Sequence, residues 1–134
     1  MPIVGFGYEK ISVERKETTK QVEITNNVNF TSLKETKMKI GNEEKPAVKA
    51  NFDYSVDYQE AGKLQMIGYV VFYDTEAKVK EYLDLWKKQQ KLATEFGAHL
   101  YNFIIAKASI RALQLEEDLS LPLHITLPRV VPKK

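Results

Sequence analysis

The sequence predicts an α+β domain in which a four-stranded antiparallel sheet is followed by a short and a long helix. Apolar and polar residues alternate through much of the first half, and after about Asp74 this gives way to the spacing of amphipathic helices. Strands grouped ahead of helices are typical of α+β folds, not of alternating α/β folds. With 134 residues, 43% of them hydrophobic and 28% charged, the chain fits a single domain over residues 1–134.

The first two predicted strands carry a weak alternation. They run from Tyr8 to Arg15 and from Gln21 to Phe30, and Thr18-Thr19-Lys20 is a plausible connection between them. The polar stretch from Lys34 to Pro46 contains Gly41 and is either a loop or the ragged end of the second strand.

The third and fourth predicted strands carry the strongest signal. From Val48 to Tyr58 every even-numbered residue is apolar or aromatic and every odd-numbered residue is polar, so one face should be buried and the other wet. After the turn signal Glu60-Ala61-Gly62, the segment from Leu64 to Tyr73 is apolar on both faces and is the predicted hairpin partner. Its second apolar face therefore needs a cover.

The helices are predicted from apolar stripes and end signals. Asp74 or Thr75 is the expected N-cap of a short helix that ends at Lys87-Lys88. Its apolar stripe consists of Val79, Tyr82, Leu83, Leu85 and Trp86. A long helix is predicted from about Leu92 to Asp118, with apolar residues spread widely enough to cover more than one surface. The tail from Leu119 to Val130 contains two prolines and should be extended.

Composition excludes several classes of function. The absence of Cys removes disulfides, thiol catalysis and Cys-based zinc sites, and it favours a cytoplasmic location. The 20 basic and 18 acidic residues are interspersed, and a net charge of +2 disfavours nucleic acid as a partner. The basic run from Lys87 to Lys91 beside Trp86 is either a nucleic-acid contact or a solvated loop. No apolar run approaches the ~20 residues that span a bilayer, so membrane insertion is not expected.

Side chains that could carry chemistry are sparse. The chain has two histidines, of which His99 should lie on the surface of the long helix and His124 should point outward. Glu116-Glu117-Asp118 is interpreted as a solvated helix end, because adjacent helical residues seldom converge on one metal ion. We therefore predict no catalytic residues, no metal ligands and no cofactor, and we do not expect an enzyme.

Aromatic residues crowd the two strongest strands, and part of this set must be core. If a single helical layer covers the sheet, the other face of the fourth strand stays exposed, which implies association or the binding of another protein. The candidate residues for client binding or for an oligomer interface, each of which could instead be core, are Phe52, Tyr54, Tyr69, Phe72, Tyr73 and Trp86.

Several stretches resemble the SecB family of export chaperones. They are Val70–Phe72 at the end of the sheet, Glu81–Trp86 in the short helix, Asn102–Leu113 in the long helix, and Leu121–Leu123 with Leu127–Val130 in the tail. The chain looks like a shortened, archaeal-type member of this family. Family members hold unfolded polypeptides and form tetramers, as dimers of dimers with the long helices between the sheets, so the resemblance implies a SecB-like fold and a homo-oligomer.

The chain also departs from the family pattern. Phe96–His99 replaces the Cys-Pro segment that the family places before the long helix, and the family's second C-terminal helix and acidic, translocase-binding tail have no counterpart. A role in protein transport is therefore less well supported than chaperone activity.

The function expected from these observations is an ATP-independent, holdase-type chaperone that binds unfolded polypeptides in apolar grooves of a dimer or tetramer. The alternative is a non-enzymatic adaptor or assembly subunit with one dedicated protein or ribonucleoprotein partner. A third class is an RNA-binding sheet that uses aromatic strand faces.

Overall fold

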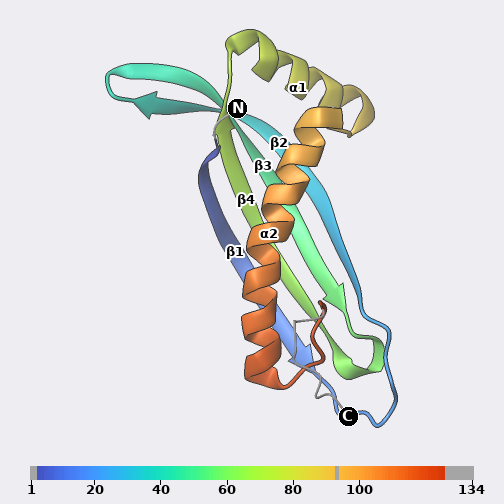
Figure 1. Cartoon of the computed structure of the whole chain (residues 1–134). Helices are drawn as coiled ribbons and strands as arrows, with labels where there is room; N and C mark the ends of the chain where they lie inside the picture. Colours follow the sequence, from blue (N-terminus) through green and yellow to red (C-terminus); the bar gives the residue numbers. More distant parts are fainter. Residues whose placement is uncertain (1–2, 93, 126–134) are drawn as a thin grey trace, which may run out of the picture.

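The computed structural model describes residues 3–92 and 94–125, where an antiparallel sheet is followed by two helices (Figure 1). The four strands are β1 (Ile3–Arg15), β2 (Thr25–Ile40), β3 (Glu43–Asp57) and β4 (Gly62–Tyr73), in the sheet order β1-β4-β3-β2. A 3-10 turn, η1 (Gln59–Ala61), joins β3 to β4, and the helices are α1 (Glu76–Gln89) and α2 (Thr94–Leu119). The predicted α+β architecture is confirmed.

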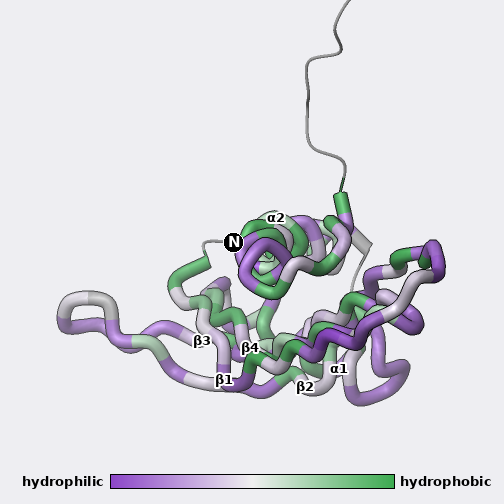
Figure 2. Tube along the Cα trace, turned by 90° about the horizontal axis from the view of Figure 1, so that it is seen from below, coloured by the Kyte–Doolittle hydropathy of each residue, from purple (hydrophilic) through white to green (hydrophobic). Residues whose placement is uncertain are grey.

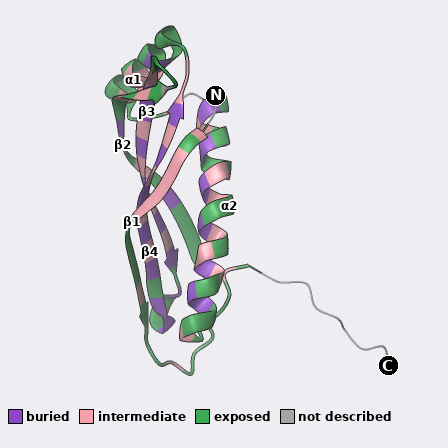
Figure 3. Cartoon of the chain, turned by 90° about the vertical axis from the view of Figure 1, so that its left-hand side faces the viewer, coloured by how far each residue is buried: buried purple, intermediate pink, exposed green. Residues whose placement is uncertain are grey.

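The core lies between one face of the sheet and α2. The even-numbered residues of β3 predicted to be buried, from Val48 to Tyr58, all have an exposed fraction of 0%. The pairing of β3 with β4 places Tyr54 opposite Met66, so the buried residues of both strands share this face. The α2 residues buried against the sheet recur every three or four positions and are Phe96, Leu100, Ile104, Ala108, Ala112 and Leu115. Figure 2 shows α2 as a layer on one side of the sheet, and Figure 3 shows its buried residues recurring along the helix.

The other face of β4 has no helix over it in the described chain. Its apolar residues are half-buried, and they are Ile67, Tyr69, Val71 and Tyr73. The Tyr69 ring lies so close to Gly7 that a Cβ there would be 2.8 Å from the phenol oxygen. Lys49 Nζ lies 4.7 Å from the centroid of the Tyr69 ring, and Lys45 Nζ lies 5.4 Å from that of Tyr73. Side chains of the neighbouring strands thus give this face a partial cover.

The first three strands each extend beyond one predicted end, but β2 begins at Thr25 and not at the predicted Gln21. The polar stretch 34–46 is the end of β2, a turn at Gly41 with φ +64°, and the start of β3. β3 pairs with β4 only from Ala47 onward, so the preceding part of the β2–β3 hairpin has no third strand. We call residues 37–46 the hairpin arm, which Figure 1 shows projecting away from the body.

Gly62 begins β4 at a point where β1 leaves no room for a side chain. Its φ is +134°, and a Cβ on it would lie 2.0 Å from the carbonyl oxygen of Glu14. Glycine is the residue that this combination of backbone angle and close approach allows. The turn signal at residues 60–62 therefore also fixes where β4 meets β1.

Two predictions for the end of α2 are wrong. Glu116 has an exposed fraction of 0% and is not part of a solvated helix end, and the His124 side chain is fully buried instead of pointing outward. The reason is the turn after the helix: Ser120 has φ +56°, and the Leu121 amide donates to the Glu116 carbonyl at 2.8 Å. This turn folds the chain back over the helix end, whereas the predicted extended tail beyond Ile125 lies outside the described residues.

Candidate functional site

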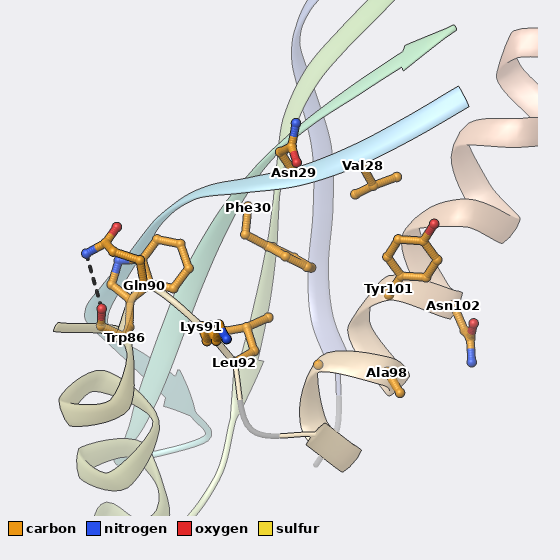
Figure 4. Close-up of a pocket in the computed structure, with 11 residues that line it drawn as sticks. Val28, Asn29, Phe30, Trp86, Gln90, Lys91, Leu92, Ala98, Tyr101 and Asn102 are labelled. Atoms are coloured by element: carbon orange, nitrogen blue, oxygen red, sulfur yellow. Dashed lines mark hydrogen bonds between the residues drawn. The ribbon is translucent and has the colours of Figure 1, made fainter. Parts of the chain in front are cut away.

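Two adjacent cavities lie between β2 and the helices, and Trp86 lines both. The first has a volume of about 550 Å³ and the second of about 500 Å³. The side chains that line the first cavity, shown in Figure 4, are Val28, Asn29, Phe30, Trp86, Gln90, Lys91, Leu92, Ala98, Tyr101 and Asn102. The second is lined by Leu33, Glu35, Glu76, Val79, Lys80, Leu83, Asp84, Trp86 and Lys87. We call the two cavities together the Trp86 groove.

Both cavities follow β2, which is an edge strand of the described sheet. The first cavity takes Val28, Asn29 and Phe30 from β2, and the second takes Leu33 and Glu35, so the groove runs along the strand. An edge strand carries backbone N–H and C=O groups that no further strand pairs. The groove therefore places apolar side chains beside backbone groups that an extended peptide could pair with.

The end of α1 positions Trp86. Thr75 is the N-cap of the helix, as predicted, and its side chain accepts a hydrogen bond from the Lys78 amide at 3.3 Å. At the other end Gln90 adopts φ +54°, and its backbone N–H and its side-chain amide both donate to the Trp86 carbonyl, at 2.8 and 3.1 Å. The turn that follows Trp86 is thus fixed, and the chain passes directly to Leu92 in the wall of the groove (Figure 4).

An aromatic cluster sets the position of α1 relative to α2. The Tyr82 ring stacks on Phe96 with centroids 4.0 Å apart, and Phe96 packs edge-on against Phe72 of β4 at 4.7 Å. The Tyr82 hydroxyl donates to Asp74 Oδ2 at 3.0 Å. Burial, followed by this hydrogen bond, raises the pKa of Tyr82 to about 12. Contacts within the chain therefore hold the two helices that border the groove.

The two cavities differ in charge. Among the lining residues of the first cavity the one charged side chain is Lys91, while Val28, Phe30, Leu92 and Tyr101 supply its apolar surface. The second cavity has an apolar floor and a mixed rim. Its floor consists of Leu33, Val79 and Leu83, and its rim of Glu35, Glu76, Asp84, Lys80 and Lys87. Two residues of the basic run, Lys87 and Lys91, thus line the groove.

The six predicted site residues occupy three places. Phe52, Tyr54 and Phe72 have exposed fractions of 0% and belong to the core beneath α2, so a client cannot contact them in this conformation. The other three are partly exposed. They are Tyr69 and Tyr73 on the helix-free face of β4, and Trp86 in the groove.

Sequence reasoning missed most of the groove. Phe30 and Val28 belong to a strand with weak alternation, and Tyr101 lies in the first turns of the long helix with an exposed fraction of 43%. The sequence signal that could have pointed to Val28 and Phe30 is that two apolar residues stand together at the end of the second predicted strand. Their proximity to Tyr101 depends on the strand order, which places β2 at the edge of the sheet.

Chemistry-bearing side chains do not gather in the groove. Within residues 3–92 and 94–125 there is no group of three or more His, Cys, Asp or Glu side chains that could hold a metal ion. His99 is exposed on α2, as predicted. In the same part of the chain, neither helix has the length and apolar character needed to cross a membrane.

Comparisons with known proteins give one result of note. No protein-family model matches the sequence, and no curated protein matches it. Among solved structures, the chain is similar in shape to a SecB-like chaperone of Mycobacterium tuberculosis, determined in complex with a ChAD peptide from the HigA1 antitoxin. The sequence identity is 14% and the TM-score is 0.48, over 99% of this chain and 92% of that one.

Proposed function

We propose that the protein is an ATP-independent, holdase-type chaperone that binds extended apolar segments of unfolded polypeptides in the Trp86 groove. The observation that carries this proposal is the pair of cavities that share Trp86 and run along an edge strand. Partly exposed apolar and aromatic residues line the first cavity, and the groove lies beside unpaired backbone groups. A polypeptide segment can use both features, and no nucleotide is needed.

One groove should bind weakly. Burying one large apolar side chain contributes about 1.5–3 kcal/mol. Two such side chains contribute about 3–6 kcal/mol, which corresponds to a dissociation constant between roughly 6 mM and 40 μM before the cost of ordering the segment. Weak, reversible binding suits a protein that must release its clients, and several grooves in one oligomer would raise the avidity for a long chain.

A homo-oligomer, dimer or tetramer, is the second part of the proposal. Its support is the half-buried apolar face of β4, which no helix of the described chain covers. The predicted cytoplasmic location remains a prediction. Multi-angle light scattering of the full chain measures the mass, and a monomer at all concentrations would contradict this part.

The binding test uses the single tryptophan of the chain. Because Trp86 lines both cavities, its fluorescence reports directly on the groove. We expect a reduced and carboxymethylated model protein, which stays unfolded, to shift the Trp86 emission to shorter wavelength, and the native form of the same protein to leave it unchanged. No shift of the Trp86 emission at the highest soluble concentration of the carboxymethylated protein would overturn the proposal.

Aggregation assays separate a holdase from a dedicated adaptor. A holdase should suppress the light scattering of several unrelated denatured proteins, without nucleotide and near equimolar ratio. A dedicated adaptor, the alternative expected from the sequence, should bind one folded partner in fixed stoichiometry and leave all of these proteins to aggregate.

A further inference from the structure

The chain after α2 is held down by one buried carboxylate. We call residues 120–125 the C-terminal strap. Its Leu121 is buried, with an exposed fraction of 6%, while Leu123 and Ile125 face outward at 42% and 41%. The side chains of Glu116 in α2 and His124 in the strap are both completely buried.

Glu116 accepts hydrogen bonds from two parts of the chain that are distant in sequence. The Tyr58 hydroxyl, at the end of β3, donates to Oε2 in a short hydrogen bond. From the strap, the His124 backbone N–H donates to Oε1 at 3.3 Å, and Nδ1 of the same residue lies 2.8 Å from Oε1. One carboxylate therefore joins α2, β3 and the strap.

This arrangement suits an ionised carboxylate, which can accept from all three donors. An ionised carboxylate has only acceptor sites, whereas a protonated one has an O–H that must itself donate. Burial, and then the hydrogen bond and charge of Glu116, raise the pKa of Tyr58 above its ordinary value, which keeps its phenol a donor. Nδ1 of His124 faces the carboxylate and donates to it in the Nδ1–H tautomer, while Nε2 is buried without a partner in the described part of the chain.

The surroundings of Glu116 offer no other charge to replace these donors. The titratable groups that face it are Tyr58 and Tyr54 of β3 and His124 of the strap. In the described part of the chain, no Lys or Arg forms an ion pair with Glu116, whereas Glu117 and Asp118 on the same helix are exposed.

We propose that Glu116 is a charge-dependent switch that holds the C-terminal strap on the body and releases it when the carboxylate is neutralised. The proposal is independent of the function assigned to the Trp86 groove. Release would uncover Leu121 of the strap, which has an exposed fraction of 6% in the held state, and the apolar surface of the body on which it packs. This apolar surface lies at the C-terminal end of α2, away from the groove beside its first turns.

Hydrogen exchange of the full chain tests the switch, with Glu116→Gln as the neutral variant and Glu117→Gln as the matched control one residue away. For Glu116→Gln at neutral pH we expect protection factors in the strap to fall at least tenfold while those of β3 and β4 are kept. The Leu121 amide should lose less than the His124 amide, because it donates to the Glu116 backbone. Glu117→Gln should keep the strap protection of the unmodified protein.

Histidine nuclear magnetic resonance gives an independent measurement, because the second histidine, His99, is exposed and serves as an internal reference. We expect His124 to carry its proton on Nδ1 in the unmodified protein and to resemble His99 in Glu116→Gln. If Glu116→Gln does not fold, His124→Phe replaces it, since this change removes the side-chain contact between the strap and the Glu116 carboxylate and keeps an aromatic ring. Unchanged strap protection in a folded Glu116→Gln, or in His124→Phe where that replaces it, overturns the proposal. Equal loss of strap protection in Glu117→Gln also overturns it.

Discussion

Replacing Tyr101 by Ala should weaken client binding without weakening the fold. The Tyr101 ring lines the first cavity of the Trp86 groove and has an exposed fraction of 43%. An aromatic side chain can bury about 150–250 Å², so the exposed part of Tyr101 leaves roughly 80 Å² for a client to cover. At ~25 cal/mol per Å² the upper limit of the loss is about 2 kcal/mol, a factor of roughly 30 in the dissociation constant.

The assay is titration of Trp86 fluorescence with the carboxymethylated protein, and the matched control is Ile110→Ala. Ile110 lies on the same helix, has an exposed fraction of 61% and is not among the residues that line the groove. Mass must be measured for both variants, because the loss of an oligomer would also lower avidity. Equal affinities for Tyr101→Ala and the unmodified protein, at equal mass, would refute the assignment of the groove.

Three further predictions concern the framework that holds the groove. Gly62→Ala should lower the free energy of unfolding by roughly 3 kcal/mol, because at φ +134° a Cβ would lie 2.0 Å from the Glu14 carbonyl oxygen. Urea denaturation measures this loss, and a loss below about 1 kcal/mol would contradict the prediction. Tyr82→Phe should remove a pH dependence of the free energy of unfolding. Because folding raises the pKa of Tyr82 from 10.0 to about 12, the stability that neutral Tyr82 contributes is complete below pH 10 and is lost as the pH rises toward 12. Denaturation of both proteins across this range should show their difference shrinking, and a constant difference would contradict the assignment. Ala108→Leu should lower the free energy of unfolding by about 1–3 kcal/mol, because Ala108 has no exposed surface and the larger side chain would push α2 from the sheet. Thermal unfolding measures this loss. A variant with unchanged stability and unchanged groove affinity would show that α2 has room to move.

The sheet was predictable where one face of a strand is buried and the other is wet. The alternation from Val48 to Tyr58 followed directly from burial under α2, so the strand and its buried face could both be derived. The hairpin arm could not be derived in the same way, because its residues are mostly exposed on both faces and no apolar pattern marks them as strand. Its cross-strand contacts are between charged side chains, such as Lys37 and Glu44 at 3.9 Å.

The functional residues were harder to predict than the fold. The core beneath α2 contains three of the predicted site residues, Phe52, Tyr54 and Phe72. Sequence alone does not separate a buried aromatic residue from one that binds a partner. Glu116 and His124 look like surface residues, because their burial depends on the turn at Ser120 and on Tyr58, far away in the chain. In both sets of residues, burial depends on contacts between segments that are distant in the sequence.

The hairpin arm offers a practical position for engineering. A side chain added at Gly41 would meet no other atom within 4 Å, and Ala47 is the first β3 residue that pairs with β4. An isolated two-stranded ribbon contributes little stability of its own, and exposed turn tips are preferred sites of tolerated insertion. A peptide tag or a fluorescent reporter placed after Gly41 should therefore leave the sheet, α2 and the Trp86 groove intact. The protein could then be immobilised or labelled at a point remote from both regions where we propose that it works.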